Sequence, residues 1–157
     1  MSGIVDVAVI GLGPTGAILS ALLGRSGINT VVIDKSDDIF PLPRAVSFDH
    51  EVMRVIQNLG LADAIQPYVV PYPPTEYRGA DGRLIARYES LPPPYPQGWQ
   101  PSLMFKQPPF ERAIRRSLVD LPMVDVRLGT ALTGLRQDDD QVELEITSAS
   151  GGAEKLR

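Results

Sequence analysis

Three glycines and one aspartate give this sequence its clearest capacity for chemistry. The segment Gly11-Leu12-Gly13-Pro14-Thr15-Gly16 has the glycine spacing of a phosphate-binding turn. In such a turn Gly11 allows a tight bend, Gly13 lets a pyrophosphate approach the backbone, and Gly16 lets a helix pack closely on a strand. Asp34 follows at nearly the spacing, roughly 20 residues, of a carboxylate that accepts from a ribose hydroxyl. The pattern predicts a dinucleotide site.

A βαβ unit is needed to position these residues. Ile4 to Ile10 is β-branched and mostly apolar, as is typical of a buried parallel strand. Pro14 to Ser26 predicts a helix, with proline at its first position and Gly27 at its C-terminal cap. Thr30 to Ile33 predicts a second strand, which Asp34 closes. The glycines alone are a weak signal, but glycines, strands, helix and acid in register favour nucleotide binding over an α/β turn with incidental glycines.

Composition excludes several classes of function. With 43% hydrophobic and 22% charged residues, the 157-residue chain can bury the core of one ordinary domain. The formal net charge of −4 predicts neither a nucleic-acid partner nor an acidic membrane surface. The absence of cysteine and the single histidine, His50, predict no metal site and disfavour a Ser-His-Asp triad. No apolar run approaches the roughly 20 residues that span a bilayer, so a cytoplasmic protein is the default expectation.

After the first unit the sequence predicts a loop and a helix, and then a proline-rich stretch. Ser36 to Arg44 predicts a loop, and Asp49 can cap a helix that stops at Gly60. A proline-dense stretch follows, in which an Asp-Gly turn predicts a hairpin. We therefore expect three segments: residues 1–70 as the nucleotide-binding core, 71–102 as a Pro-rich insertion, and 103–157 as the continuation of the core.

The third segment predicts a return to α/β structure. Its expected elements are a strand at Leu103 to Phe105, a helix opening at Pro108 or Pro109, a parallel strand at Val124 to Leu128, an antiparallel hairpin made by Ala131 to Arg136 and Gln141 to Thr147, and a further strand starting at Leu156.

Motifs beyond the glycine turn point to a particular family. Pro43-Arg44-Ala45-Val46 follows the second strand, and Gln107 stands at a helix entrance before Phe110-Glu111-Arg112. With the glycine motif and Ile33-Asp34-Lys35, the sequence resembles the N-terminal part of FAD-dependent aromatic hydroxylases of the p-hydroxybenzoate hydroxylase type. It is most similar to the 3-(3-hydroxyphenyl)propionate hydroxylase branch. The resemblance covers almost the whole chain.

The resemblance implies a fold and a set of roles. The fold is α/β: a Rossmann-like FAD-binding domain with a parallel sheet, an antiparallel β excursion and the start of a substrate-domain hairpin. Asp34, where relatives usually have Glu, would hold the adenosine ribose, and Lys35 would cover the adenine side. Arg44 would reach the pyrophosphate or the ribityl chain, with Ala45 and Val46 beside the isoalloxazine ring. Gln107 would bind the ribityl or pyrophosphate part, and Gly11, Gly13, Pro14, Thr15 and Gly16 would cradle the pyrophosphate.

Plainer interpretations stay open beside these roles. Arg44 on its own would be a solvated loop charge, and Gln107 could equally cap the helix opened by Pro108. His50 is more typical of a helix start than of a catalytic base. The run Asp138 to Asp140 is typical of a solvated turn. No catalytic residue can be named from the sequence.

The resemblance also predicts a longer enzyme. Two further family motifs are expected, an Asp-Gly segment after a strand and a Gly-Asp segment, and neither is assigned up to Arg157. Asp81-Gly82 has the letters of the first but stands in the predicted hairpin turn. A sheet ending at Arg157 would leave Ile4 to Ile10 as an exposed apolar edge, which we expect the remainder of the enzyme or another chain to cover. The sequence leaves the oligomeric state open, with a homodimer among the options.

The function implied by the resemblance is an NAD(P)H-dependent monooxygenase. Reduced pyridine nucleotide would reduce FAD, and O2 would form a flavin C4a-hydroperoxide that hydroxylates a phenolic or aromatic acid. Two alternatives remain, an NAD-binding dehydrogenase domain and a truncated, non-catalytic nucleotide-binding module. The sequence does not choose the aromatic substrate, nor NADH over NADPH.

Overall fold

The computed structural model describes residues 4–157, which form two compact units. Unit 1 combines the described residues up to Pro41 with Glu111–Arg157, and unit 2 is Leu42–Phe110. The α/β class is confirmed, whereas the three-segment division made from the sequence stays a prediction. Among residues 4–157 there is no helix with the length and apolar character to cross a membrane.

A parallel sheet forms the centre of unit 1. Strand β1 (Val7–Ile10) leads through helix α1 (Pro14–Arg25) to β2 (Thr30–Ile33), and β8 (Val124–Arg127) pairs with the far side of β2. All pairs are parallel, in the order β1-β2-β8, which leaves β1 at an edge. The predicted βαβ unit and third parallel strand are thus confirmed, although β1 begins at Val7 and not at the expected Ile4.

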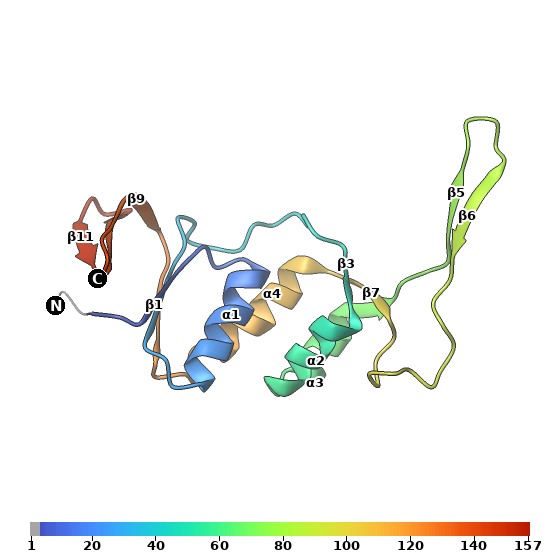
Figure 1. Cartoon of the computed structure of the whole chain (residues 1–157), viewed down its shortest axis with the longest axis horizontal. Coiled ribbons are helices and arrows are strands. Elements are labelled where there is room, and N and C mark those ends of the chain that lie inside the picture. The colour runs from blue at the N-terminus through green and yellow to red at the C-terminus, as the bar shows by residue number, and fades with distance from the viewer. Residues whose placement is uncertain (1–3) are drawn as a thin grey trace. The chain divides into compact units, whose positions relative to one another are not determined.

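An antiparallel meander covers one face of this sheet. Its strands are β9 (Thr130–Gln137), β10 (Val142–Ser148) and β11 (Ala153–Leu156), with β10 in the centre. Figure 1 shows the meander and α1 on opposite sides of β1. The shared core consists of Val31, Ile33, Leu144, Ile146 and Leu156.

The end of the chain differs from the expectation of a strand that starts at Leu156. Leu156 instead ends β11, which pairs antiparallel with β10. A tight turn makes this possible, because Gly151 adopts a φ of 86° and its N–H donates to Ser148 O at 2.9 Å. The strand was not visible in the sequence because it has only four residues, of which only Leu156 is buried.

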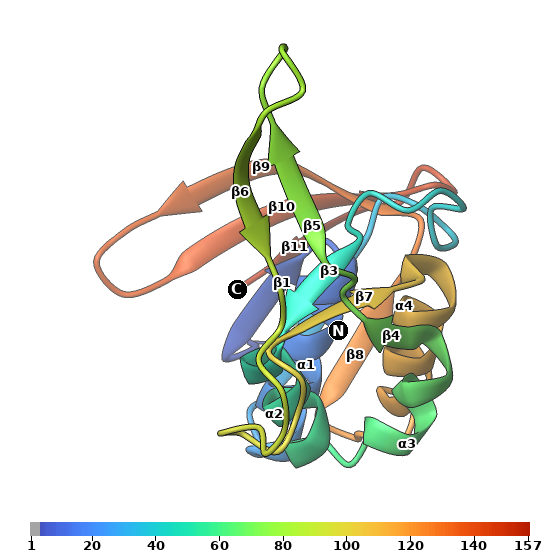
Figure 2. The same ribbon diagram turned by 90° about the vertical axis from the view of Figure 1, so that its right-hand side faces the viewer.

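Unit 2 is built on a small antiparallel sheet. Strand β7 (Ser102–Phe105) lies between β3 (Ser47–Asp49) and β4 (Val69–Pro71). Neither β3 nor β4 was predicted, because each has only three residues and shows no alternation. The other elements of the unit are α2 (His50–Asn58), α3 (Ala62–Ile65), the 3-10 helix η1 (Gln66–Tyr68), and the hairpin strands β5 (Thr75–Arg78) and β6 (Leu84–Tyr88), which Figure 2 shows as an extended ribbon.

Helix α4 (Gln107–Ser117) connects the two units. Its first residues pack in unit 2, where Phe110 contacts Phe48 and Phe105 with ring centroids 5.4 and 4.7 Å apart. In unit 1, Ile114 of the helix and Leu118, which directly follows the helix, are buried. The predicted helix therefore forms, beginning at Gln107 itself.

Candidate functional site

The glycine turn follows β1 as the sequence predicts. Gly11 adopts a φ of 100°, and its N–H donates to Ile33 O at 2.8 Å, which ties the turn to the end of β2. A Cβ added at Gly16 would overlap the carbonyl oxygen of Gly11. A Cβ added at Gly13 would meet no atom within 4 Å. Gly16 therefore serves the packing of α1 on the turn, and Gly13 leaves the space in front of the turn open.

The N-terminus of α1 is uncapped by any side chain. Gly13 is the N-cap residue and Pro14 occupies the first turn, which contains no acidic residue. The first N–H groups of a helix have no intrahelical acceptor, and the helix dipole adds a partial positive charge there. Thr15, on the same turn, is exposed. This arrangement suits a phosphate group.

Asp34 is joined to the glycine turn by its side chain. Its Oδ2 accepts a hydrogen bond from the Leu12 N–H at 2.8 Å, and its Oδ1 accepts from the Ser36 N–H at 2.9 Å. The spacing of Asp34 was visible in the sequence, but this bracing of the turn was not. The adjacent Lys35 is exposed.

Glu111, which is buried, and Arg115, which is partly buried, lie on α4 in the same unit as Asp34, and the sequence did not predict their contacts. Arg115 Nη2 is 2.7 Å from Glu111 Oε1 and 4.0 Å from Asp34 Oδ2. The signal for the first contact was available, because an acid and an arginine four residues apart lie on one face of a helix. The approach of Arg115 to Asp34 depends on tertiary packing and has no sequence signal.

In unit 2, Gln107 holds the loop that carries Arg44. Its side chain is buried, and Oε1 accepts hydrogen bonds from the Arg44 N–H at 2.7 Å and the Ala45 N–H at 2.9 Å. Val46 O accepts from the Phe105 N–H at 3.0 Å, which continues the attachment of the loop to β7. The loop backbone is thus held while Arg44, Ala45 and Val46 are exposed.

Comparison with known proteins assigns the chain to a family. The profile of a family described as an FAD binding domain matches residues 4–157, which is nearly the whole chain. The chain belongs to the FAD binding domain family. The resemblance to FAD-dependent aromatic hydroxylases is confirmed, as is FAD as the cofactor of the family.

Individual relatives agree with this assignment. The chain is 36% identical over 146 residues to a 3-(3-hydroxy-phenyl)propionate/3-hydroxycinnamic acid hydroxylase of Burkholderia cenocepacia, covering 93% of this chain and 27% of that protein. It is 34% identical over 154 residues to a probable NADH-specific resorcinol 4-hydroxylase of Rhodococcus jostii, covering 98% and 29%. The crystal structure of p-nitrophenol 4-monooxygenase PnpA from Pseudomonas putida superposes with a TM-score of 0.82 at 29% identity, covering 100% and 40%. The chain thus spans well under half the length of these relatives.

The residues of unit 1 fit the ADP part of FAD. The uncapped N-terminus of α1 and the open space at Gly13 suit a pyrophosphate. The Asp34 carboxylate, at the end of β2, suits a ribose hydroxyl. No group of three or more His, Cys, Asp or Glu side chains in the described part of the chain could hold a metal ion.

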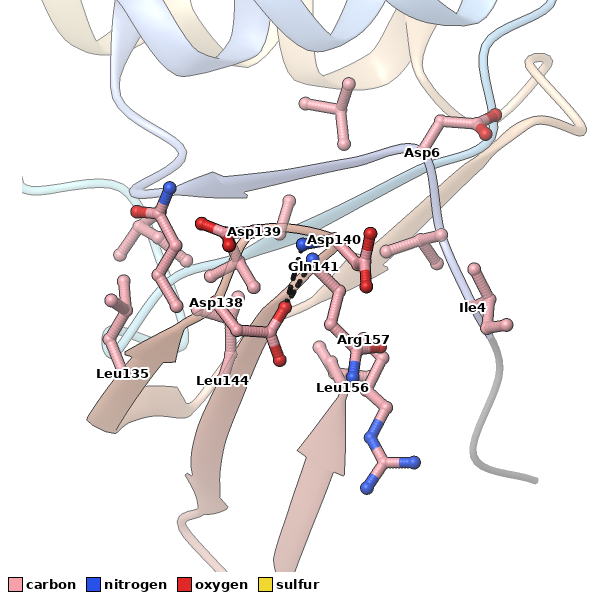
Figure 3. A pocket seen from close by; sticks show the side chains of 16 residues that line it. Ile4, Asp6, Leu135, Asp138, Asp139, Asp140, Gln141, Leu144, Leu156 and Arg157 are labelled. Atoms are coloured by element: carbon pink, nitrogen blue, oxygen red, sulfur yellow. Dashed lines mark hydrogen bonds between the residues drawn. The ribbon is translucent and has the colours of Figure 1, made fainter.

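A cavity of about 620 Å³ lies elsewhere in this FAD binding domain, beside the open edge of β1. Figure 3 shows the segment that bears Ile4 and Asp6 on one side, and the turn Asp138 to Gln141 with Leu144 and Leu156 on the other. None of the glycines of the turn lines this cavity, nor does Asp34. It is therefore a feature of the sheet edge and not of the nucleotide site.

His50 and Asp138 occupy local structural positions, at a helix start and in a turn. His50 begins α2, and its N-cap Asp49 accepts from the Val52 N–H at 3.0 Å. Asp138 closes an exposed turn, and the N–H groups of Asp140 and Gln141 lower the pKa of its carboxyl by donating hydrogen bonds to it.

Proposed function

We propose that this chain is the FAD-binding part of a flavoprotein monooxygenase that hydroxylates a phenolic or other aromatic acid with NADH or NADPH and O2. The observation that carries the proposal is the pairing of an uncapped helix N-terminus with Asp34, which accepts from the backbone of the same glycine turn. Family membership and the printed names of the relatives support the reaction class.

We assign the ADP part of FAD to unit 1. Gly11, Gly13, Pro14, Thr15 and Gly16 would surround the pyrophosphate, because the backbone N–H groups and the dipole of α1 attract its negative charge. Asp34 would accept from the adenosine ribose, and the exposed Lys35 would lie on the adenine side.

We assign the remainder of FAD to the loop of unit 2. Arg44 would neutralise the pyrophosphate or reach the ribityl chain, and Ala45 and Val46 would run beside the flavin ring. All three side chains are exposed, while Gln107 holds the backbone that carries them. Gln107 would add a contact of its own to the ribityl or pyrophosphate part. A loop held by its backbone positions such contacts with little loss of conformational entropy on binding.

The cofactor and the protein would contribute different parts of the reaction. Bound FAD supplies the hydride acceptance and the oxygen activation of the reaction. The residues of this chain bind and orient it. The choice among phenolic acids, and the choice between NADH and NADPH, would depend on residues that these sites do not include.

The test uses the full-length protein. Flavin absorption bands, together with NADH or NADPH oxidation stimulated by 3-(3-hydroxyphenyl)propionate or resorcinol, are expected. One atom of ¹⁸O from ¹⁸O2 should enter the aromatic product. A colourless protein that binds NAD in place of FAD would support a dehydrogenase domain instead. A protein that binds FAD but oxidises no pyridine nucleotide would be a non-catalytic nucleotide-binding module.

We further propose that the open edge of β1 is covered in the longer protein. Ile10, the last residue of β1, is 50% exposed, and Ile4, which precedes the strand, is 80% exposed. An apolar edge strand of this kind invites pairing with another chain. The cavity beside it offers room for a further segment.

A further inference from the structure

Helix α4 places a partly buried arginine near Asp34, the carboxylate proposed to bind the ribose of the nucleotide. The Arg115 side chain is 13% exposed, and the Glu111 side chain is 3% exposed. Neither residue belongs to the glycine motif or to the roles that the resemblance implies. Buried charges are retained in proteins mainly where a partner compensates them, so the partners of Arg115 indicate what it does.

One guanidinium nitrogen serves two carboxylates. Arg115 Nη2 lies 2.7 Å from Glu111 Oε1, which is a charge-assisted hydrogen bond, and 4.0 Å from Asp34 Oδ2, which is a longer electrostatic contact. Because Glu111 and Arg115 are one helical turn apart, α4 itself fixes the position of the guanidinium. The Arg115 Nε is buried and has no hydrogen-bond partner in the described structure. The hydrogen bond to Glu111 and the low exposure of Arg115 therefore restrain the guanidinium near Asp34.

Asp34 Oδ2 is also the atom that accepts from the Leu12 N–H at 2.8 Å. The same oxygen thus faces a backbone donor of the glycine turn and a cation of α4. With Oδ1 held by the Ser36 N–H, the carboxylate has a defined orientation before any nucleotide binds. Pre-organisation of this kind raises affinity because the side chain loses less conformational entropy when the ligand binds.

We propose that Arg115, held by Glu111, is a positioning residue that orients the Asp34 carboxylate toward the adenosine ribose of the cofactor. The inference rests on the proposed function, since it requires Asp34 to accept from that ribose. Arg115 acts through Asp34 and need not contact the nucleotide.

The test measures ligand affinity in the full-length apoprotein, by flavin fluorescence for FAD and by displacement of FAD for ADP. Arg115→Met is expected to weaken both ligands about tenfold, the loss of one oriented charge-assisted contact. Arg115→Lys, which keeps the charge but not the guanidinium geometry, should recover part of the loss. Arg116→Met is the matched control, because Arg116 is the exposed neighbour on the same helix and should leave both affinities unchanged.

Two measurements distinguish a positioning role of Arg115 from a general loss of folded structure in the variant. The ligand 2′,3′-dideoxy-ADP lacks both ribose hydroxyls, so Arg115→Met should bind it as well as the unaltered protein does. In a double-mutant cycle, Arg115→Met should add little to the loss caused by Asp34→Asn. If Arg115→Met does not fold, Glu111→Gln replaces it in both comparisons, with a smaller loss of the same pattern.

The outcomes distinguish the inference from the proposed function. Failure of the unaltered protein to bind FAD or ADP would overturn both. Normal binding by the unaltered protein, with an Arg115→Met loss that is equal for ADP and its dideoxy analogue or additive with Asp34→Asn, would overturn the positioning role alone. An Arg115→Met affinity equal to that of Arg116→Met would do the same.

Discussion

Asp34 Oδ2 accepts a hydrogen bond from the Leu12 N–H at 2.8 Å, joining the end of β2 to the glycine turn 22 residues earlier. The contact gives one carboxylate two tasks, to hold the turn in shape and to present an acceptor beside it. Because Oδ1 also accepts, from the Ser36 N–H, both oxygens are engaged by backbone donors. The glycine turn and the acid at the end of β2 are thus one structural unit.

Asp34→Asn should therefore lower both the free energy of unfolding and the affinity for FAD. An asparagine has only one carbonyl oxygen, so its amide group would face one of the two N–H donors. We expect unfolding free energy to fall by about 1–2 kcal/mol and FAD affinity to fall tenfold or more, as for other charged hydrogen bonds, roughly 1.5–3 kcal/mol each. Urea denaturation and flavin fluorescence measure the two effects.

Asp37→Asn is the control for this substitution, because Asp37 is an exposed acid in the segment that follows Asp34. It should change neither quantity measurably. Equal behaviour of the two variants would contradict the role of Asp34.

Alanine substitutions at Gly13 and Gly16 should have different effects, on FAD affinity and on the free energy of unfolding respectively. Gly16→Ala would force a Cβ onto the Gly11 carbonyl, so we expect a loss of at least about 1–3 kcal/mol of unfolding free energy from overpacking. Gly13→Ala meets no atom within 4 Å, and its backbone φ of −69° suits alanine, so the apoprotein should keep its stability. Its Cβ would instead occupy the space proposed for the pyrophosphate, and FAD affinity should fall about tenfold or more.

Thermal denaturation of the apoproteins and FAD titration distinguish the two glycine variants. Gly13→Ala with undiminished FAD affinity would place the pyrophosphate elsewhere. Gly16→Ala with unchanged stability would show that the turn relaxes around the added methyl group.

The structural features that depend on a local sequence pattern were predicted from the sequence. The first βαβ unit, the Asp49 cap and the Asp-Gly hairpin were all visible, because each depends on residues close together in the chain. Strands β3 and β4 were not visible, since three residues provide too little periodicity. The contacts of Asp34 with Leu12 and Arg115, and of Gln107 with Arg44, join residues 22 to 81 positions apart and arise only from tertiary packing.

Gln107→Leu should loosen the loop that carries Arg44. Gln107 Oε1 accepts from both the Arg44 and Ala45 N–H groups, so leucine would leave two backbone donors without their acceptor. We expect a loss of about 1–3 kcal/mol of unfolding free energy and faster amide exchange at Arg44 and Ala45. Gln66→Leu is the control, since Gln66 is exposed in the same unit. Unchanged amide exchange at the two loop residues would show that other contacts hold the loop.

The ion pairs of Glu143 should give the meander a pH-dependent contribution to stability. Its carboxyl lies 2.7 Å from Lys155 Nζ and 3.0 Å from Arg157 Nη2, and hydrogen bonds from these two cations lower its pKa in the folded state. The group then binds protons more readily when unfolded, so its contribution is complete above the ordinary carboxyl pKa, about 4.3. The contribution is lost as the pH falls through the lowered, folded-state pKa.

Glu143→Gln tests this sign. The stability difference between the two proteins should be present at pH 7 and should shrink progressively below about pH 4.3. Urea midpoints at pH 7 and pH 3 measure it, with added salt expected to reduce the difference at pH 7 because the pairs are near the surface. Asp63→Asn, at an exposed acid of unit 2, is the control. A difference that grows on acidification would contradict the assignment.

The open edge of β1 should make residues 1–157 self-associate when they are produced alone. Ile10 is half exposed beside the cavity that lies between β1 and the meander, and an unpaired apolar edge is a template for intermolecular strand pairing. Ile10→Lys should reduce this association, because a charge on an edge strand opposes pairing. Ile85→Lys is the matched control, since Ile85 is 69% exposed on the β5–β6 hairpin of unit 2 and is not a residue of β1. Sedimentation velocity over a range of concentrations measures the effect, and the longer protein should show no such dependence on Ile10. A stable, FAD-saturated monomer of residues 1–157 would refute the proposal that another segment covers β1.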